Sequence, residues 1–358
     1  MKDQNSSVGL DGAPDDEEIL RFLEASKPRI ILVGAGGSGC NTLNRMVEVG
    51  VAGATFVAMN TDARHLLKTR ADKKILLGKK ITRGMGAGSN PKVGEKAAEE
   101  SLEDIKRIVQ EASMVFVTCG LGGGTGTGSA PLIARAAKEA GALTVAVVTL
   151  PFNSEGTVRR KNALDGLQKL KSTVDTIIVI PNEKLLNIVP DLPLDTAFKV
   201  ADEVLTSASK GIVELVTKAG LVNLDFADLY TILKDGGAAV VGLGESGQET
   251  KPSERAILAI ENALVNPLLE IELSKGNRAL VNVVGGEDMT LKEAEMMVKE
   301  VASRINSDSH IIWGARIDRD MPRNILKVLV VIAGAELPEY SMDELTRREI
   351  ELDIDMVA

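Results

Sequence analysis

The sequence predicts an α/β protein with a doubly wound, mostly parallel sheet, a long central helix and a second, smaller α+β domain. Two observations predict this architecture: short runs of β-branched and apolar residues alternate with helical patterns, and these runs are continuously apolar rather than alternating. Continuous apolar runs are typical of parallel strands buried on both faces, and their alternation with helices is typical of doubly wound sheets. The expected strands are Ile30–Val33, Thr55–Met59, Met114–Thr118, Thr144–Thr149 and Thr176–Ile180, with a further one at Lys74–Leu77.

Helical periodicity predicts the elements between and after these strands. One helix is expected over Lys92–Gln110, and a longer one from Asp195 to about Ala219, with Gly220 just past its end. A helix of about 25 residues spans about 37 Å, enough to cross one domain and contact another. Beyond it, two helices (254–266 and 290–306) and three strands (279–284, 309–317 and 325–333) predict the smaller domain. The expected division is an N-terminal extension with a short helix (1–27), a nucleotide-binding domain (28–195), the central helix (196–220), a C-terminal α+β domain (221–334) and a charged tail (335–358).

Composition excludes several classes of function. The chain has 358 residues, of which 44% are hydrophobic and 26% charged, and a net charge of −9. An acidic chain is a poor partner for nucleic acid, whose binding depends on clustered Lys and Arg. Cys40 and Cys119 are too few for a disulfide framework or a zinc site and indicate a reducing, cytoplasmic compartment. No apolar stretch reaches the ~20 residues of a membrane span, so no direct membrane insertion is expected.

The most informative motif is a glycine-rich loop at 122–128, which reads Gly-Gly-Gly-Thr-Gly-Thr-Gly. It follows the apolar run ending at Thr118 and precedes an expected helix start at Ser129–Pro131, with Pro131 in the first turn. Bare backbone N–H groups between a strand and a helix form a place to wrap an anion. A flexible linker uses the same residue types but does not lie between a buried strand and a helix. The loop therefore predicts a phosphate cradle.

A second glycine loop follows the first strand and opens a helix. It satisfies G-x-G-x-x-G through Gly34, Gly36 and Gly39, and Asp62 lies near where a dinucleotide fold places its ribose-binding carboxylate. An ordinary dinucleotide fold has one such loop per pyrophosphate, whereas this chain has two, both expected at the carboxyl edge of one sheet. Two converging loops suit a triphosphate better than NAD. The chain has no G-x-x-x-x-G-K-[ST], which excludes the P-loop class.

Other polar segments are expected at the same edge of the sheet. Asn60–Asp62 ends the second strand, and Gly86–Pro91 precedes the helix at Lys92, where it can close over the terminal phosphate or simply form a capping turn. Glu155 and Arg159 lie four residues apart after Pro151–Phe152. This spacing fits a solvated ion pair, and it also fits a carboxylate and a guanidinium directed at ribose and phosphate.

A base-binding site is expected from Asn182, Phe198 and Asp202. A purine needs an aromatic or apolar face and directed hydrogen bonds, and the oxygens of Asn and Asp can accept from the N1–H and N2 edge of guanine, whereas adenine offers no comparable pair of donors. The alternative is that Phe198 is a core residue and Asp202 a surface residue.

Two carboxylates follow the long helix in the segment Asn223-Leu224-Asp225-Phe226-Ala227-Asp228. Asp225 and Asp228 are spaced to share one face at a helix start, where capping is the default explanation. The long helix is expected to carry them far from the glycine loops of their own subunit. If they contact a phosphate, we expect it to belong to another molecule.

Together these motifs resemble those of the tubulin/FtsZ family, and of FtsZ more closely than tubulin. The resemblance extends from about Lys27 to Gly334, and its most specific part is the glycine-rich loop at 122–128. It implies a cytoplasmic GTPase that binds GTP or GDP with Mg²⁺ and polymerises head to tail into the cytokinetic ring at midcell. The acidic N-terminal extension and the short tail are similar to archaeal members.

The resemblance and the motifs together assign the site residues. Asn223, Asp225 and Asp228 are the expected catalytic residues, acting on the GTP of the neighbouring subunit, and no metal ligand is assigned to the protein. The expected nucleotide-binding residues are Gly36, Gly37, Ser38, Gly39, Cys40, Asn41, Asp62, Ala87, Gly88, Gly123, Gly124, Thr125, Gly126, Thr127, Glu155, Arg159, Asn182, Phe198 and Asp202.

The tail is expected to bind division-ring or membrane-tethering partners. Ile350, Leu352, Ile354 and Met356 alternate with acidic residues, a pattern able to add as an edge strand or fill an apolar groove; a solvated tail is the alternative.

Two other functions remain as alternatives. An NAD-dependent oxidoreductase requires a catalytic His, Cys or Tyr–Lys pair, yet neither His65 nor His310 lies in a promising setting. A non-hydrolysing nucleotide-bound scaffold requires Asp225 and Asp228 to be merely structural.

Overall fold

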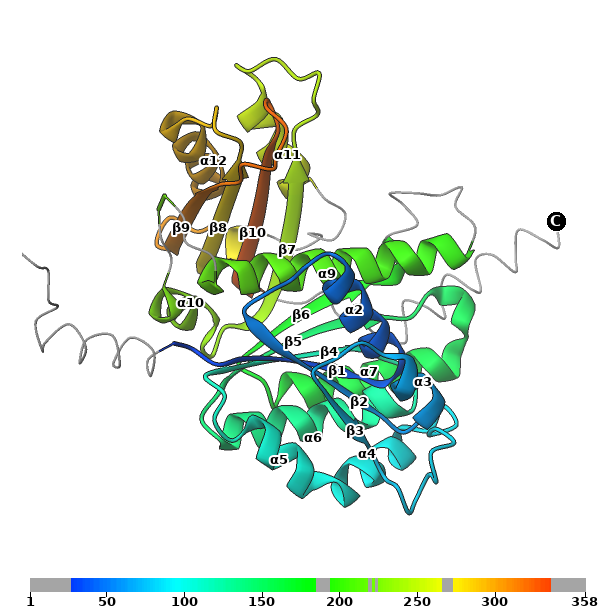
Figure 1. Ribbon diagram of the computed structural model, residues 1–358. Coiled ribbons are helices and arrows are strands. Elements are labelled where there is room, and N and C mark those ends of the chain that lie inside the picture. The colour runs from blue at the N-terminus through cyan, green and yellow to red at the C-terminus, as the bar shows by residue number, and fades with distance from the viewer. Residues whose placement is uncertain (1–26, 185–193, 218–220, 223–224, 266–272, 336–358) are drawn as a thin grey trace, which may run out of the picture.

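The computed structural model describes residues 27–184, 194–217, 221–222, 225–265 and 273–335. Within these ranges, ten strands form one sheet in the order β3-β2-β1-β4-β5-β6-β7-β10-β8-β9 (Figure 1). The strands are β1 (Ile30–Ala35), β2 (Ala54–Asn60), β3 (Lys73–Leu76), β4 (Met114–Gly120), β5 (Leu143–Leu150), β6 (Thr176–Pro181), β7 (Gly237–Glu245), β8 (Arg278–Gly285), β9 (His310–Ile317) and β10 (Leu326–Ala335). The helices are α2 (Gly36–Glu48), α3 (Ala63–Lys68), α4 (Pro91–Glu100), α5 (Leu102–Val109), α6 (Thr125–Glu139), α7 (Thr157–Lys171), α9 (Leu194–Thr217), α10 (Phe226–Leu233), α11 (Arg255–Leu264) and α12 (Leu291–Arg304), with short 3₁₀ turns η1 (Asn153–Glu155) and η3 (Leu273–Lys275).

The predicted doubly wound sheet is confirmed for its first part. Strands β3 to β7 pair in parallel. One face of this part is covered by α4, α5, α6 and α7, and the other by α2, α3, α9 and α10, each through its own apolar cluster. All residues of β5 are buried, as a continuously apolar strand between two helical layers requires.

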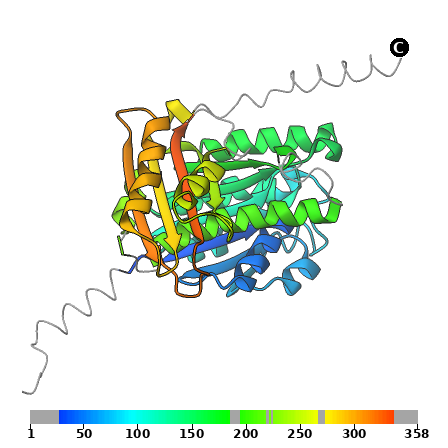
Figure 2. The ribbon, with the colours of Figure 1, turned by 90° about the horizontal axis from the view of Figure 1, so that it is seen from above.

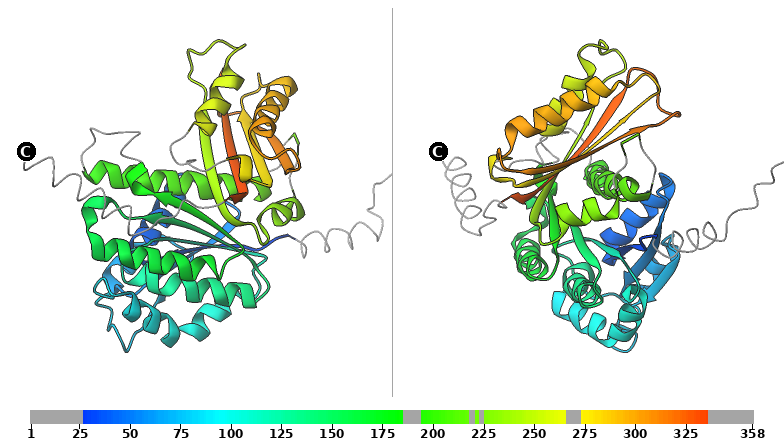
Figure 3. Two further views of the ribbon diagram at one scale, coloured as in Figure 1. Left: turned by 180° about the vertical axis from the view of Figure 1, so that it is seen from behind. Right: turned by 90° about the vertical axis from the view of Figure 1, so that its left-hand side faces the viewer.

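The second part of the sheet was only partly predicted. Strand β7 was missed; it pairs in parallel with β6 and antiparallel with β10, so one sheet continues from the first part into the second. Helices α11 and α12 cover one face of this second part, and they lie on the far side of β10 from α9 (Figure 3).

The long central helix was predicted nearly to its ends. Helix α9 has 24 residues, which gives it a length of about 36 Å. It packs beside α2 and runs between the two parts of the sheet (Figures 1 and 2). Its buried residues, such as Leu205 and Ile212, belong to the same apolar cluster as residues of β1, β8 and β10.

Two predicted helix boundaries were wrong. The helix expected over Lys92–Gln110 is two helices, because Ser101 ends α4 and its hydroxyl accepts a hydrogen bond from Gly78 N (3.0 Å). Helix α6 begins at Thr125 rather than Ser129, so Pro131 lies in the second turn. Residues 125–128 of the loop therefore already form the first helical turn, which Ser129 stabilises by donating its hydroxyl to Thr125 O (2.7 Å).

The N-terminal extension and the tail beyond Ala335 lie outside the described residues, as do the predictions made for them. In the part of the chain that is described, no helix is both long and apolar enough to cross a membrane.

Candidate functional site

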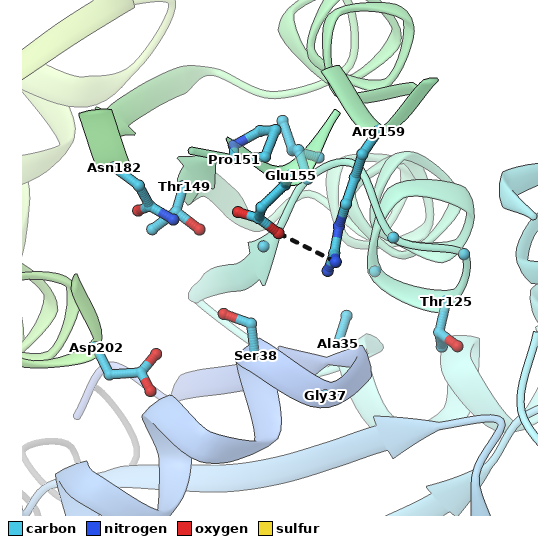
Figure 4. A pocket seen from close by; sticks show the side chains of 15 residues that line it. Ala35, Gly37, Ser38, Thr125, Thr149, Pro151, Glu155, Arg159, Asn182 and Asp202 are labelled. Atoms are coloured by element: carbon cyan, nitrogen blue, oxygen red, sulfur yellow. Dashed lines mark ion pairs between the residues drawn. The ribbon is translucent and has the colours of Figure 1, made fainter. Parts of the chain in front are cut away.

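A pocket opens where β1, β4, β5 and β6 end, at the carboxyl edge of the parallel strands (Figure 4). Ligands of open α/β sheets bind at this edge. The residues that line it are Ala35, Gly37, Ser38, Gly120, Leu121, Gly123, Gly124, Thr125, Gly126, Thr149, Pro151, Glu155, Arg159, Asn182 and Asp202. Both glycine loops, the Glu155 and Arg159 pair, Asn182 and Asp202 are thus brought together, although they are spread between residues 35 and 202 of the sequence.

Two helices begin at this pocket without a side-chain cap. Helix α2 starts at Gly36 and α6 at Thr125; in neither does a side chain accept from the first-turn N–H groups, and neither first turn contains an acidic residue. The first N–H groups of a helix have no partner within it, and they carry the positive end of its dipole. Two such ends at one pocket form a site for an anion with several negative charges.

Several glycines of the two loops are needed for packing of the loops on one another. Gly36 has a positive φ of 73°, and a Cβ there would lie 2.7 Å from Gly126 N. A Cβ on Gly126 would lie 3.1 Å from Ala35 O, and a Cβ on Gly39 would lie 2.4 Å from Thr118 O. Gly36 and Gly126 let the two helix starts approach each other, and Gly39 lets α2 pack closely on β4.

Other glycines of these loops face the open pocket or pack against the loop at the edge of the pocket. A Cβ on Gly123 would meet nothing within 4 Å, and one on Gly37 would meet only His65 at 3.6 Å. Gly124 instead contacts the 86–91 loop, because its Cβ would lie 2.8 Å from Ala87 Cβ. The 86–91 loop therefore packs against the glycine-rich loop, while Gly88 lies exposed at its tip. Asn90 caps α4 by accepting from Lys92 N (3.0 Å), so the capping turn is formed, and closure over a terminal phosphate stays a prediction.

Glu155 and Arg159 form an ion pair at one wall of the pocket, with Nη1 and Oε2 3.0 Å apart (Figure 4). Glu155 is held in place because its other oxygen accepts from Phe152 N (2.8 Å). Arg159 is about half exposed (49%). The pair therefore presents a guanidinium cation near the uncapped helix starts.

At the opposite wall, two acceptors lack donors. Asn182 is 6% exposed and no described residue donates to its buried Oδ1. Asp202 of α9 faces the pocket (Figure 4), and burial raises the pKa of its carboxyl to about 6. A buried acceptor without a donor costs free energy, so this wall fits a ligand that supplies N–H groups.

Four of the expected binding residues direct their side chains elsewhere. Asp62 caps α3 by accepting from Arg64 N (2.8 Å) and His65 N (3.0 Å), and the hydrogen bond from His65 is the main cause of its lowered pKa. Asn41 contacts His65 Nε2 (3.1 Å). The Cys40 thiol is fully buried, and burial raises its pKa.

Thr127 is the fourth. Its hydroxyl accepts from Gly122 N (2.9 Å), which stabilises the turn before α6. These four side chains stabilise the loops, and their assignment to the nucleotide stays a prediction.

The remaining expected residues lie away from this pocket or outside what can be described. Asp225 and Asp228 cap α10 reciprocally: Asp228 N donates to Asp225 Oδ1 (2.8 Å) and Asp225 N donates to Asp228 Oδ2 (3.1 Å). Helix α10 lies by the C-terminal end of α9, at the opposite end of the sheet from the pocket (Figure 1). Asn223 and the side chain of Phe198 lie outside the described part of the structure.

Several residues that line the pocket were not predicted from the sequence. Ala35, Gly120, Leu121 and Thr149 line the pocket because β1, β4 and β5 run one to two residues further than predicted or end at it. Their position at the carboxyl ends of predicted parallel strands could have identified them, because residues there face the edge of the sheet where ligands bind.

A doubly wound sheet whose carboxyl edge carries two uncapped helix starts defines a nucleotide-binding α/β protein. Comparison with known proteins identifies the class further. Residues 29–190 match the Tubulin/FtsZ family, GTPase domain, and residues 237–336 match the FtsZ family, C-terminal domain.

Relatives and solved structures agree with these matches. "Cell division protein FtsZ 1" of Methanocaldococcus jannaschii is 53% identical over 96% of this chain and 93% of its own length, and that of Archaeoglobus fulgidus is 52% identical over 90% and 87%. The solved structure "FtsZ dimer, empty (M. jannaschii)" superposes with a TM-score of 0.84 at 55% identity, covering 90% of this chain and 93% of that one. A CetZ1 structure from Haloferax volcanii shares the fold at 22% identity, with a TM-score of 0.76 over 91% of this chain and 99% of that one. The chain belongs to the FtsZ family within the tubulin/FtsZ GTPases.

Proposed function

We propose that this FtsZ-family GTPase assembles head to tail into filaments of the cell-division ring and hydrolyses GTP only where one subunit contacts the next. The protein is a cytoskeletal cell-division GTPase that binds GTP and GDP and associates with itself. The proposal assigns nucleotide binding to one subunit and water activation to its neighbour. It rests on one observation: the pocket and the carboxylates of α10 lie at opposite ends of the same subunit.

The pocket fits a guanine nucleotide along its length. The phosphates would lie against the starts of α2 and α6, with Arg159 beside them. The base would lie between Asn182 and Asp202, where two acceptor groups match the N1–H and N2 donors of guanine. This orientation would satisfy the unpartnered Asn182 oxygen.

Mg²⁺ fits this arrangement if phosphate oxygens and water supply most of its ligands, as is common for this ion. The carboxylates lining the pocket are Glu155 and Asp202, and Glu155 is already paired with Arg159. In the described residues, no group of three or more His, Cys, Asp or Glu side chains could hold a metal. When bound, Mg²⁺ would offset the phosphate charge as the terminal phosphoryl group is transferred to water.

Water activation is the step that the pocket does not supply. Phosphoryl transfer needs an oriented water, and neither lining carboxylate lies at the phosphate end without a partner. Asp225 and Asp228 each use one oxygen for the cap and retain the other for a water. Asp202 lies near the N-terminal end of α9, and the 15 residues from there to Thr217 span about 22 Å, so Asp225 and Asp228 reach a nucleotide only on a neighbouring subunit.

Head-to-tail stacking brings the α10 end of one subunit onto the pocket of the next. Such a heterologous contact repeats without closing and produces a filament. We place Asn223 with the two aspartates in this role, and we place the filament in the cytoplasm at midcell. Residues 349–358 are proposed to recruit division-ring or membrane-tethering partners.

The proposal is tested by measuring phosphate release per subunit as protein concentration increases. A shared site requires the specific activity to rise steeply with concentration and to follow the sedimented fraction. A specific activity that is constant from dilute monomer to assembled filament contradicts it.

An NAD-dependent oxidoreductase is not favoured. None of the described residues that line the pocket is His, Cys or Tyr, and Asp62, the residue this function needs for the ribose, uses its Oδ1 to cap α3. The scaffold alternative is tested by the same phosphate-release measurement.

A further inference from the structure

The C-terminal end of α10 is held by side chains from both parts of the sheet. The last four carbonyls of a helix have no partner within it. Here Arg278 Nη1 of β8 donates to Lys234 O (2.6 Å), the residue after the helix, and lies within hydrogen-bond distance of Thr231 O (3.2 Å) and Ile232 O (3.5 Å) in the last turn. Thr176 of β6 donates its hydroxyl to Leu233 O. The end of this helix is thus bonded to β6 on one side and to β8 on the other.

An ion-pair cluster adds a second attachment. Lys234, the residue that follows α10, donates to Asp175 Oδ1 (2.8 Å), and Lys138 of α6 lies 3.3 Å from the same oxygen. The Asp175 side chain is fully buried, and its other oxygen accepts from Thr144 N (2.9 Å). Its pKa is lowered because the donors outweigh the cost of burial. Asp175 stays ionised at neutral pH and anchors Lys234 to the amino edge of β5 and β6.

We infer that Arg278, together with the Asp175–Lys234 pair, is a positioning residue for hydrolysis: it sets the angle at which α10 presents Asp225 and Asp228 to the neighbouring nucleotide. This inference rests on the proposed role of the two aspartates. The helix has eight residues, about 12 Å, with its attachments at one end and the aspartates at the other. A tilt of about 5° about the attached end moves the aspartates by about 1 Å, and a 1 Å misplacement of a reacting group costs about 100-fold in rate.

The first test uses single-turnover phosphate release from filaments assembled with GTP, so that nucleotide exchange does not contribute. Arg278→Ala removes three of the four carbonyl contacts and is expected to slow release at least tenfold. Its GTP affinity and sedimented fraction are expected to match wild type, because Arg278 is remote from the pocket. Arg278→Lys restores a cation that can donate to the same carbonyls, and should recover at least a third of the wild-type rate. A general loss of structure would lower the sedimented fraction together with the rate of phosphate release.

Controls separate this inference from the proposed function. Arg304→Ala removes an arginine of α12 that bonds Glu300 in its own helix, and is expected to change nothing. If Asp225→Ala is slow but Arg278→Ala hydrolyses at the wild-type rate, the positioning role is wrong and the proposed function stands. If both variants hydrolyse at the wild-type rate, the proposed function is wrong.

A milder variant keeps the inference testable if Arg278→Ala does not fold or assemble. Thr176→Val removes one hydroxyl donor with little change of shape, while Leu233 O still accepts from Gly236 N (3.2 Å). A rate two- to fivefold below wild type in normal filaments supports the positioning role. An unchanged rate contradicts it.

Discussion

Asp202 should make nucleotide binding depend on pH in a way that reports its contact with the base. Burial raises the pKa of its carboxyl from 3.8 to about 6, and none of the described residues donates to it. A base that donates N–H groups binds the ionised form, so below pH 6 binding must first release a proton. With a pKa of about 6, the resulting penalty is about 11-fold at pH 5 and negligible at pH 7, a tenfold loss of affinity over two pH units.

The perturbation is Asp202→Asn, which cannot ionise and replaces one acceptor by a donor. Its GDP affinity at pH 7 is expected to be at least tenfold weaker, because a paired buried acceptor contributes about 1–3 kcal/mol. The raised pKa also means that the folded chain binds the proton more tightly than the unfolded chain. The carboxyl therefore lowers stability as pH rises from about 4 to 6, and Asp202→Asn should stabilise the nucleotide-free protein at pH 7.5 by up to about 2 kcal/mol after allowance for solvent screening.

The assay is a GDP titration of wild type and Asp202→Asn at pH 5, 6 and 7, with thermal unfolding of both proteins. Titration of the phosphates is common to the two proteins and cancels in the ratio of their affinities. The affinity of wild type divided by that of Asp202→Asn is expected to fall about tenfold from pH 7 to pH 5. A ratio that does not change with pH refutes the assignment of Asp202 to the base.

Three further predictions concern specificity, the glycine loops and the tail. In a competition titration, GTP should bind at least tenfold more tightly than ATP, because Asn182 and Asp202 offer acceptors that match guanine; equal affinities contradict the base assignment. Gly36→Ala should weaken GTP binding at least tenfold and lower Tm, because its Cβ would lie 2.7 Å from Gly126 N at a positive φ. The control Gly123→Ala places its Cβ where nothing lies within 4 Å and should keep the wild-type Tm. Equal Tm values for the two variants would show that Gly36 is not needed for packing. Deletion of residues 349–358 should leave GTP hydrolysis intact and delocalise the protein in cells; unchanged ring placement counts against a recruiting tail.

The first part of the fold was predictable because its strands are buried on both faces. Runs such as Thr144–Thr149 are continuously apolar, and the structure places all of β5 in the core. Strand β7 was missed because Gly237–Glu245 mixes alanine and glycine with its β-branched residues, which weakens the strand signal. The break at Ser101 was missed because the helical period continues across it. The contacts at the end of α4 are tertiary: Gly78 N donates to the Ser101 hydroxyl, and Lys80 N and Ile81 N donate to the Glu100 carboxylate.

The pocket was predictable in its location and less so in its details. Glycine loops after parallel strands indicated the edge of the sheet, but the sequence does not distinguish a glycine that admits a ligand from one that admits another backbone. Gly36 and Gly126 are of the second kind, and Gly123 of the first. Asp62 was assigned to the ligand because carboxylates near such loops often bind ribose; the alternative role, capping a helix as short as α3, has no strong periodic signal.

The contacts that hold α10 could not be predicted at all. Arg278, Thr176 and Asp175 are separated from the helix by 44 to 59 residues of sequence. Only the pairing of β6 with β7 and of β8 with β10 brings them together.

The shared active site is tested most directly by mixing two inactive variants. Asp225→Ala is expected to bind GTP but lacks the carboxylate. Gly123→Trp retains Asp225 and is designed to block the pocket, at a position where a Cβ meets nothing within 4 Å. Each variant alone is expected to hydrolyse GTP poorly. In co-sedimenting mixtures, we expect phosphate release to return and to be greatest near equal amounts, because Asp225 of one variant then meets GTP held by the other. Mixtures that co-sediment and remain inactive at every ratio would contradict hydrolysis at the subunit interface.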